Sequence, residues 1–212
     1  GGRRAQQETM TRYWTVQHPE VWQRLQRGEA VHGPALDHKD DAMFRDAYAW
    51  MMRQMDALPD ADVASLGTPV WVWPTRVDLR EATFRRWAKD QRMVLLTLEM
   101  QSDRVLLSDY DAWHFVLNYW YLGGERASDC FHRWTERVCN TDVYRSKPLP
   151  LDRAHRLVER SWRRVFELER LRTRLEYGTS PQSAQGTLWR LKPEDVVGVV
   201  EYGMGRPKTV LL

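Results

Sequence analysis

Short runs rich in β-branched and aromatic residues occur at both ends and in the middle of the chain. Such runs are typical of β-strands, because branched and ring side chains fit a pleated, partly buried surface. The pattern predicts strands at residues 12–17, 69–73, 93–100, 105–107, 184–191 and 196–202. Turn-forming residues separate the third run from the fourth and the fifth from the sixth. Each of these two pairs is therefore expected to form a β-hairpin.

Other segments place apolar residues three and four positions apart, which is the spacing of one face of an α-helix. A proline opens the first of them and a glycine follows it, while three others begin at or just after an aspartate. Helices are expected at residues 19–27, 41–57, 109–122, 125–138 and 152–177. Strands at both ends enclose the helices, so the expected fold class is α+β, with a mixed or antiparallel sheet of short strands and several packed amphipathic helices.

The last of these helices has two distinct faces. Val158 and Trp162 belong to an apolar stripe, and Arg156, Arg160 and Arg163 lie opposite it. An arginine face of this kind can follow the phosphates of a nucleic acid. Glutamates interrupt it, however, and a solvated surface is the more common role of such a face.

Composition narrows the possible functions. The chain of 212 residues has 32 Lys and Arg against 29 Asp and Glu, a net charge of +3 that does not by itself demand a nucleic-acid partner. No run approaches about 18 consecutive apolar residues, so no membrane span is expected. Gly1–Thr9 is predicted to be a flexible leader and residues 10–212 a single domain. The two cysteines are compatible with a reducing compartment, so a cytoplasmic location is expected.

The motifs of several kinds of enzyme are absent from the sequence. The chain contains no phosphate-binding glycine loop, no Gly-x-Ser-x-Gly elbow and no His-Glu-x-x-His metal motif. Cys130, His132 and Cys139 are close in sequence, but their spacing matches no common zinc pattern. No metal cofactor is therefore predicted.

Aromatic residues and one histidine are the remaining candidates for a site. The chain has 11 tryptophans, whose rings form either a core or surfaces on which a ligand ring stacks. Trp71 and Trp73 are two positions apart on a predicted strand and so share a face. They suit a stacking platform, although a core wall is the commoner use. His114 suits a general base, although a boundary histidine bonded to its neighbours is again commoner.

Seven short sequences, taken in order, resemble the bacterial family catalogued as domain of unknown function 3841. They are Trp14–Gln17, Tyr48–Met51, Trp71–Trp73, Asp78–Arg80, Leu107–Tyr110 with Trp113, His114 and Asn118, Ser161–Trp162, and Gln185–Trp189. They extend through the chain from residue 12 to about residue 200. The chain is therefore identified as a member of this family, whose name implies no activity.

A second resemblance is to ADP-ribosyltransferase-like domains of the type that modifies DNA and RNA. In those domains a first strand, a helix ending in glycine and a last strand form the site, and Trp14–Gln17, Pro19–Gly28 and Gln185–Leu191 occupy these places here. The resemblance implies NAD as cofactor and a nucleic acid or a protein as target. For this function we expect a cofactor cleft formed by Trp14 and Thr15 of the first strand and by the aromatic residues Tyr48, Trp71 and Trp73. For this function we expect Gln185, His114 and Gln17 to be the catalytic residues.

The chain departs from the transferase pattern at two polar positions. Gln17 replaces the Arg or His of those enzymes, and the last strand carries Gln185 and Thr187 where a Glu is expected. An amide cannot supply the negative charge that stabilises an oxocarbenium-like sugar. Another acid, such as Glu99, Asp109 or Glu201, would have to contribute. Gln17 and Gln185 are expected to open into one concavity.

Two other functions stay open. The first is a non-enzymatic module whose aromatic cleft and basic helix bind a nucleotide or a single-stranded nucleic acid. The second is a structural or partner-binding domain in which the tryptophans are all core. A carboxylate beside the Gln185 strand would distinguish the transferase from both, and nicotinamide release from NAD would test it.

Overall fold

The computed structural model describes residues 9–35, 42–139, 151–172 and 184–212. Its helices and two β-sheets confirm the α+β fold class. The described residues divide into two compact units, and the chain passes between them more than once. The first unit draws on Gly1–Ala35, Gln54–Leu106 and Gly186–Leu212, and the second on Leu36–Arg53 and Leu107–Gln185.

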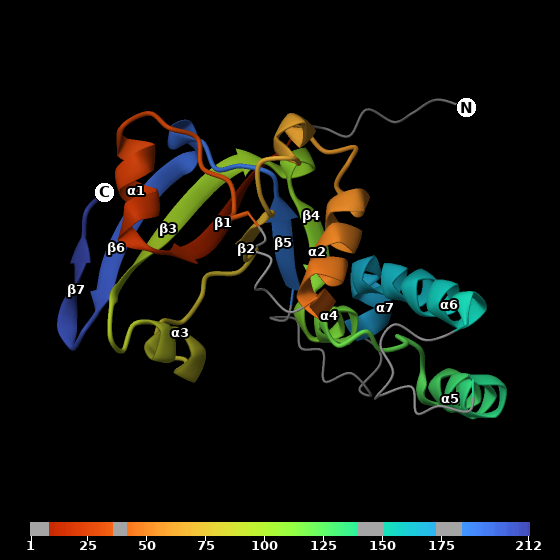
Figure 1. Ribbon diagram of the computed structural model, residues 1–212. Coiled ribbons are helices and arrows are strands. Elements are labelled where there is room, and N and C mark those ends of the chain that lie inside the picture. Colours follow the sequence, from red (N-terminus) through yellow and green to blue (C-terminus); the bar gives the residue numbers. More distant parts are fainter. Residues whose placement is uncertain (1–8, 36–41, 140–150, 173–183) are drawn as a thin grey trace. The chain divides into compact units, whose positions relative to one another are not determined.

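A four-stranded sheet dominates the first unit, with the strand order β1-β3-β6-β7 (Figure 1). Its strands are β1 (Met10–Gln17), β3 (Arg92–Gln101), β6 (Val196–Gly203) and β7 (Arg206–Val210). Each neighbouring pair is antiparallel. In the inner strand β3, Leu95 lies opposite Val16 on one side and opposite Val200 on the other. These three side chains therefore share one face of the sheet.

Two short helices belong to the same unit. Helix α1 (Pro19–Gln26) starts at a proline, which suits the first helical position because the N–H it lacks has no helical partner there. Helix α3 (Ala82–Trp87) places Phe84 in an apolar cluster with Val16 and Leu95. The same unit has 3₁₀ turns at Ala61–Val63, Ser102–Arg104 and Pro193–Asp195.

A second sheet has three strands in the order β2-β5-β4. These are β2 (Val70–Val72), β5 (Ala184–Leu188) and β4 (Leu106–Asp109). Strands β2 and β5 are antiparallel. Just after β2, Trp73 forms an isolated antiparallel bridge with Trp14 of β1. The backbone of β1 is thereby tied to the end of β2.

Helices make up most of the second unit. They are α2 (Ala42–Gln54), α4 (Tyr110–Leu117), α5 (Glu125–Cys139), α6 (Asp152–Trp162) and α7 (Leu168–Arg172). Asp109 caps α4, since its carboxylate accepts a hydrogen bond of 2.8 Å from the Ala112 N–H. The Trp50 ring meets Trp162 edge-on at 5.6 Å and stacks on Phe166 at 5.8 Å, so tryptophan contributes directly to the core of this unit.

Both predicted hairpins are wrong. The strand predicted at residues 93–100 pairs with β1 and β6, while the one at 105–107 belongs to the other sheet. The strands predicted at 184–191 and 196–202 are likewise in different sheets. In each case the intervening residues form a 3₁₀ turn instead of the two-residue turn that joins the strands of a tight hairpin.

The hairpin that does form, between β6 and β7, is not among the predictions. Its turn residues Met204 and Gly205 have φ angles of 53° and 66°, as a type I′ turn requires at both central positions. Glycine adopts such angles freely, whereas methionine does so rarely. The sequence signal for this turn is therefore weak.

The helix predicted at residues 152–177 is interrupted. Helix α6 ends at Trp162, and a 3₁₀ turn over Arg163–Phe166 follows it. Glu167 then has a ψ angle of 56°, which is outside the helical region, before α7 begins. The apolar stripe survives the interruption, because Trp162 and Val165 are both buried.

Several predictions fall on positions outside the described residues. They are residues 1–8 of the leader, the helix caps Asp40 and Asp41, and residues 173–177 of the last helix. Within the described ranges, no helix is both long and apolar enough to cross a membrane.

Candidate functional site

A pocket of about 330 Å³ lies in the first unit, on the sheet face that carries Leu95 and Val200. These two side chains are apolar and line the pocket from the sheet. The segment between β2 and α3 supplies a second wall, and Lys208 of β7 supplies a third. The described residues that line it are Arg76, Val77, Asp78, Leu79, Arg80, Leu95, Val200 and Lys208.

The charged side chains of the pocket are predominantly cationic. Asp78 accepts bonds of 3.0 and 2.7 Å from the Arg80 guanidinium and one of 2.9 Å from the Arg80 backbone N–H. These bonds, with a smaller contribution from the charge of Lys208, lower the pKa of Asp78 to about 2. Within the described ranges, Arg76 and Lys208 form no ion pair. The described part of the lining has three cations against one carboxylate, which gives it a net charge of +2.

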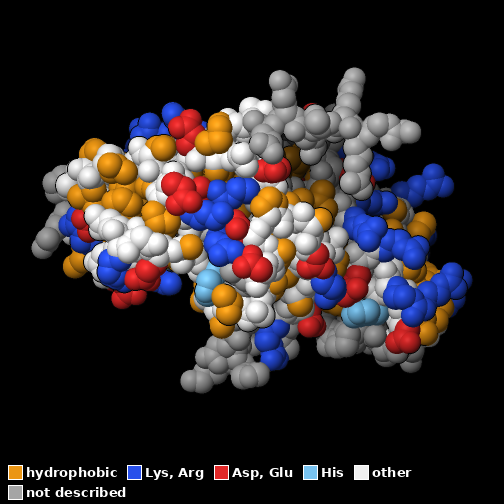
Figure 2. All heavy atoms as spheres, turned by 90° about the horizontal axis from the view of Figure 1, so that it is seen from above, with side chains coloured by type: hydrophobic (Ala, Val, Ile, Leu, Met, Phe, Trp, Pro, Cys, Tyr) orange, Lys and Arg blue, Asp and Glu red, His pale blue; other side chains and the backbone are white. Residues whose placement is uncertain are grey.

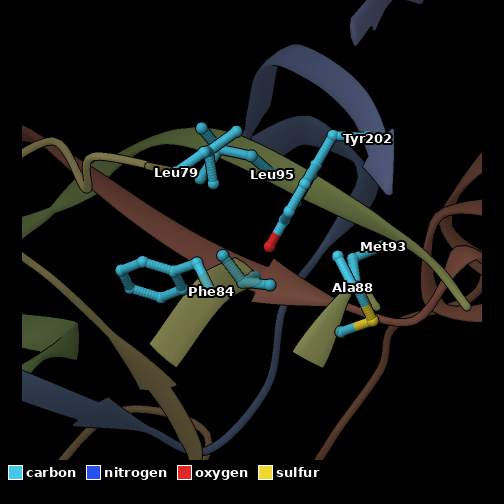
Figure 3. Packing of buried hydrophobic residues seen from close by; sticks show 7 residues of the cluster. Leu79, Phe84, Ala88, Met93, Leu95 and Tyr202 are labelled. Atoms are coloured by element: carbon cyan, nitrogen blue, oxygen red, sulfur yellow. The ribbon is translucent and has the colours of Figure 1, made fainter. Parts of the chain in front are cut away.

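An apolar cluster lies beside the pocket and shares Leu79 and Leu95 with it. Tyr202 belongs to the same cluster, and Figure 3 shows its hydroxyl pointing in among the apolar side chains. The Tyr202 side chain is 5% exposed, and its hydroxyl has no hydrogen-bond partner among the described residues. Burial alone raises its pKa to about 12. The pocket is thus backed by rigid, closely packed core.

Two of the predicted cofactor-binding residues, Trp14 and Trp73, lie next to each other. Their backbones exchange hydrogen bonds of 2.9 and 2.8 Å. Both side chains are partly buried against the cluster, and the Trp73 ring meets Phe84 edge-on at 5.6 Å. In this position the two indoles act as a wall of the core.

Thr15 and Gln17 point to the other face of β1, because successive side chains of a strand alternate. The Thr15 hydroxyl is fully buried and donates a bond of 2.8 Å to the Trp71 carbonyl. The Gln17 side-chain amide donates a bond of 2.8 Å to the Thr15 hydroxyl oxygen. The predicted residues on β1 are therefore close to β2, but they lie on two faces of the sheet. The Trp14 side chain is on one face, and the Thr15 and Gln17 side chains are on the other.

The other predicted cofactor and catalytic residues belong to the second unit. Tyr48 is half-buried and meets Trp113 edge-on at 6.0 Å. His114 is exposed, and its Nδ1 donates a bond of 2.9 Å to the Tyr110 carbonyl one helical turn earlier. This bond is the neighbour contact that a boundary histidine makes.

Gln185 is 4% exposed, and its amide nitrogen has no hydrogen-bond partner among the described residues. The fully buried Ser108 hydroxyl in the same unit also has none. Buried polar atoms of this kind are few in folded proteins, and each calls for an explanation. Because Gln17 belongs to the first unit and Gln185 to the second, a shared concavity stays a prediction.

The three predicted nucleic-acid-binding residues, Arg156, Arg160 and Arg163, are all exposed. They lie on α6 and the turn that follows it, opposite the buried Val158 and Trp162. Figure 2 shows Lys and Arg side chains gathered at the right of the view, where Figure 1 has α5 and α6.

The acids considered as substitutes for a catalytic Glu all have other partners. Glu201 accepts a bond of 2.5 Å from Arg92, and Glu99 lies 3.8 Å from Arg12. Asp109 caps α4. None of the three lines the pocket.

Comparison with known proteins gives a family for the chain. A family model described as domain of unknown function (DUF3841) matches residues 12–197. The chain belongs to the DUF3841 family. No curated protein and no solved structure gives a significant match.

The DUF3841 resemblance includes one segment of the pocket. Of the seven sequences that carry it, Asp78–Arg80 is the one that lines the cavity. Arg76 and Lys208 are not among the site residues predicted from the sequence, and Lys208 lies beyond the matched residues 12–197. The alternation of Arg76, Asp78 and Arg80 along the segment is a signal that could have indicated a charged wall.

The described part of this DUF3841 chain contains no group of three His, Cys, Asp or Glu side chains that could hold a metal ion. Cys130 is exposed and Cys139 half-buried, and both are free thiols. The chemistry that the pocket can support therefore comes from its cations and its apolar surface.

Proposed function

We propose that this domain binds a phosphate-bearing small molecule of the nucleotide class in the pocket of the first unit. The observation that carries the proposal is the combination of unpaired cations and an apolar floor in one cavity. Arg76 and Lys208 would contact the phosphate, and Leu95 and Val200 would lie against the uncharged part of the ligand. A volume of about 330 Å³ is within the range of small-molecule sites.

Arg80 has a different role from the other two cations. Its guanidinium is already bonded to Asp78 through both carboxylate oxygens. The pair fixes the planar fork of Arg80 at the pocket edge, and an Arg so held retains other N–H donors. Arg80 would therefore orient a phosphate that Arg76 and Lys208 attract.

Binding is proposed in preference to ADP-ribosyl transfer because of the catalytic carboxylate that transfer requires. Transfer needs a carboxylate placed to stabilise the sugar as nicotinamide departs. Asp78 is the one carboxylate that the described residues bring to the lining, and it is bonded to Arg80. Among the described residues, the lining has no Ser, Thr, Cys or His that could act as a nucleophile or general base.

Titration calorimetry with ATP, AMP, NAD and adenosine tests the proposal. The three phosphate-bearing compounds should bind and adenosine should not. Lys208→Gln or Arg76→Gln should weaken binding about tenfold or more, since a hydrogen bond to a charged group contributes roughly 1.5–3 kcal/mol. Lys89→Gln is the matched control, because Lys89 is exposed in the same unit and does not line the pocket.

Two results would overturn the proposal. One is equal binding of adenosine and AMP. The other is an unchanged affinity for AMP and ATP in both pocket variants. Chromatography of the NAD sample separates binding from transfer, because free nicotinamide would accumulate with time if the domain cleaved the cofactor.

A further inference from the structure

Four arginines form a single row along α6 and the turn after it. They are Arg153, Arg156, Arg160 and Arg163, and all four are exposed. Their spacing of three, four and three residues keeps them on one helical face. At 1.5 Å per residue the row extends over about 15 Å. A ligand with several negative charges in line is the natural complement of such a row.

Two acids on the same segment, Glu159 and Glu167, do not neutralise the row, because they have other cationic or histidine partners. Glu159 lies 3.7 Å from Arg53 and 3.4 Å from the His155 ring. Glu167 is paired with Arg170 at 2.9 Å. Within the described ranges, none of the four arginines of the row forms an ion pair. The positive charge of the row is thus available to a ligand.

An aromatic ring stands at one end of the row. The guanidinium carbon of Arg153 lies 5.5 Å from the centre of the Trp134 ring, which belongs to α5 of the same unit. Trp134 is half-buried, so part of its indole is accessible. Unpaired nucleic-acid bases stack on aromatic rings and on arginine planes. Phosphate-binding cations and a stacking surface therefore occur side by side.

A lipid surface fits this row less well. Helices that bind membranes present an apolar face to the lipid. Of the apolar residues of α6, Ala154, Val158 and Trp162 are buried and Leu157 is half-buried. The exposed residues of the helix are Asp152, Arg153, Arg156 and Arg160.

We propose that this surface binds single-stranded nucleic acid. Arg156, Arg160 and Arg163 contact successive phosphates, and Trp134 with Arg153 stacks a base at the end of the row. The surface is in the second unit and the pocket in the first, so the inference does not rest on the proposed function.

Fluorescence anisotropy of a labelled single-stranded oligonucleotide, measured over a range of salt concentrations, tests the inference. The triple variant Arg156→Gln, Arg160→Gln, Arg163→Gln should bind about tenfold or more weakly. The slope of log affinity against log salt should become shallower by about 2, because each phosphate of a single strand that is no longer neutralised accounts for about 0.7. The same three positions changed to Lys should retain most of the slope, because the charges remain.

Two further variants test whether binding depends on this surface or only on general electrostatic attraction to a positively charged protein. Arg85→Gln, Arg86→Gln, Lys89→Gln removes three exposed positive charges from the first unit and should leave affinity and slope unchanged. Trp134→Leu should weaken binding of the single strand several-fold without changing the slope, since stacking releases no counterions. Circular dichroism of each variant checks that the fold is retained.

The outcomes are distinguishable. The inference is overturned if the unmodified protein does not bind the oligonucleotide, or if the arginine variant and the first-unit control lose affinity equally. It is also overturned if duplex DNA binds as tightly as the single strand, or if a polyglutamate peptide displaces the oligonucleotide at equal charge concentration. If the pocket does not bind nucleotides, the oligonucleotide result is unaffected. If the arginine row does not bind the oligonucleotide, the nucleotide titration is likewise unaffected.

Discussion

Removing the Tyr202 hydroxyl should stabilise the protein. Tyr202 is 5% exposed, and its hydroxyl has no hydrogen-bond partner among the described residues. Leaving a buried polar group unpaired costs roughly 1–3 kcal/mol. Tyr202→Phe keeps the ring that packs in the cluster and removes only the oxygen. The free energy of unfolding should therefore rise by about 1 kcal/mol or more, as measured by urea denaturation near neutral pH.

Tyr119→Phe is the matched control with the opposite sign. Tyr119 is also buried, at 6% exposure, but its hydroxyl is hydrogen-bonded to His155. Losing one partner of a bond of this kind leaves the other without it, which is destabilising by about 1 kcal/mol. Opposite effects of the same chemical change would isolate the contribution of the hydroxyl bond.

The alkaline limb of the stability profile provides a second measurement on Tyr202. Burial raises the pKa from the ordinary 10.0 to about 12 in the folded state. Between these values the unfolded chain releases the proton first, so stability falls as the pH rises from about 10 to about 12. A difference of about 2 pKa units corresponds to roughly 3 kcal/mol. Tyr202→Phe should lack this part of the loss.

Two results would refute this reasoning. A loss of more than about 1 kcal/mol in Tyr202→Phe at neutral pH would mean that the hydroxyl makes a favourable bond in solution. An alkaline profile identical to that of the unmodified protein would mean that the hydroxyl titrates at its ordinary pKa and is accessible to water.

The remaining predictions concern single side chains. Trp162→Ala should cost roughly 3–5 kcal/mol in denaturant unfolding, because Trp162 is 1% exposed; a loss below about 1 kcal/mol would contradict its place in the core. Asp109→Ala should cost about 1 kcal/mol by the same assay, because the Ala112 N–H loses its cap; no loss would show that the cap contributes nothing. Arg80→Gln should raise the pKa of Asp78 from about 2 toward 3.8 in an NMR titration; an unchanged pKa would assign the shift to another cation.

Features that depend on neighbouring residues were predictable from the sequence. The proline of α1 and the Asp109 cap of α4 each fix a helix start through atoms a few residues away. The strand β1 is equally clear, because its β-branched and aromatic residues are consecutive. Helix periodicity also placed Val158 and Trp162 on the buried face.

Strand pairing was not predictable in the same way. Strand β3 pairs with β1, where Tyr13 lies opposite Leu98, and with β6, where Val199 lies opposite Leu96. Partners so distant in sequence leave no local signal, whereas a turn between two adjacent strands suggests a hairpin even when none forms. The pocket has the same difficulty, since Arg76, Leu95 and Lys208 meet only once the sheet is assembled.

The distribution of the tryptophans bears on the choice between a core and a binding surface. Trp50, Trp113, Trp162 and Trp189 are buried. Trp87 and Trp120 are 41% and 36% exposed. The composition alone cannot separate these uses, because the same indole serves a core or a ligand. In this chain, tryptophan therefore builds the core at some positions and lies at the surface at others.

The pocket combines two kinds of side chain that respond differently to a ligand. Leu79 and Leu95 belong at once to the lining and to the core cluster, so moving them would disturb packing that a folded protein maintains tightly. Arg76 and Lys208 are exposed and can adjust their long side chains. The pocket should accordingly select ligands by their charge, through Arg76 and Lys208 at the rim. It should also select them by size, because the packed floor sets a fixed limit on the bulk of the ligand. A ligand series with constant phosphate and increasing apolar bulk should lose affinity abruptly at that limit, whereas added phosphates should raise affinity gradually.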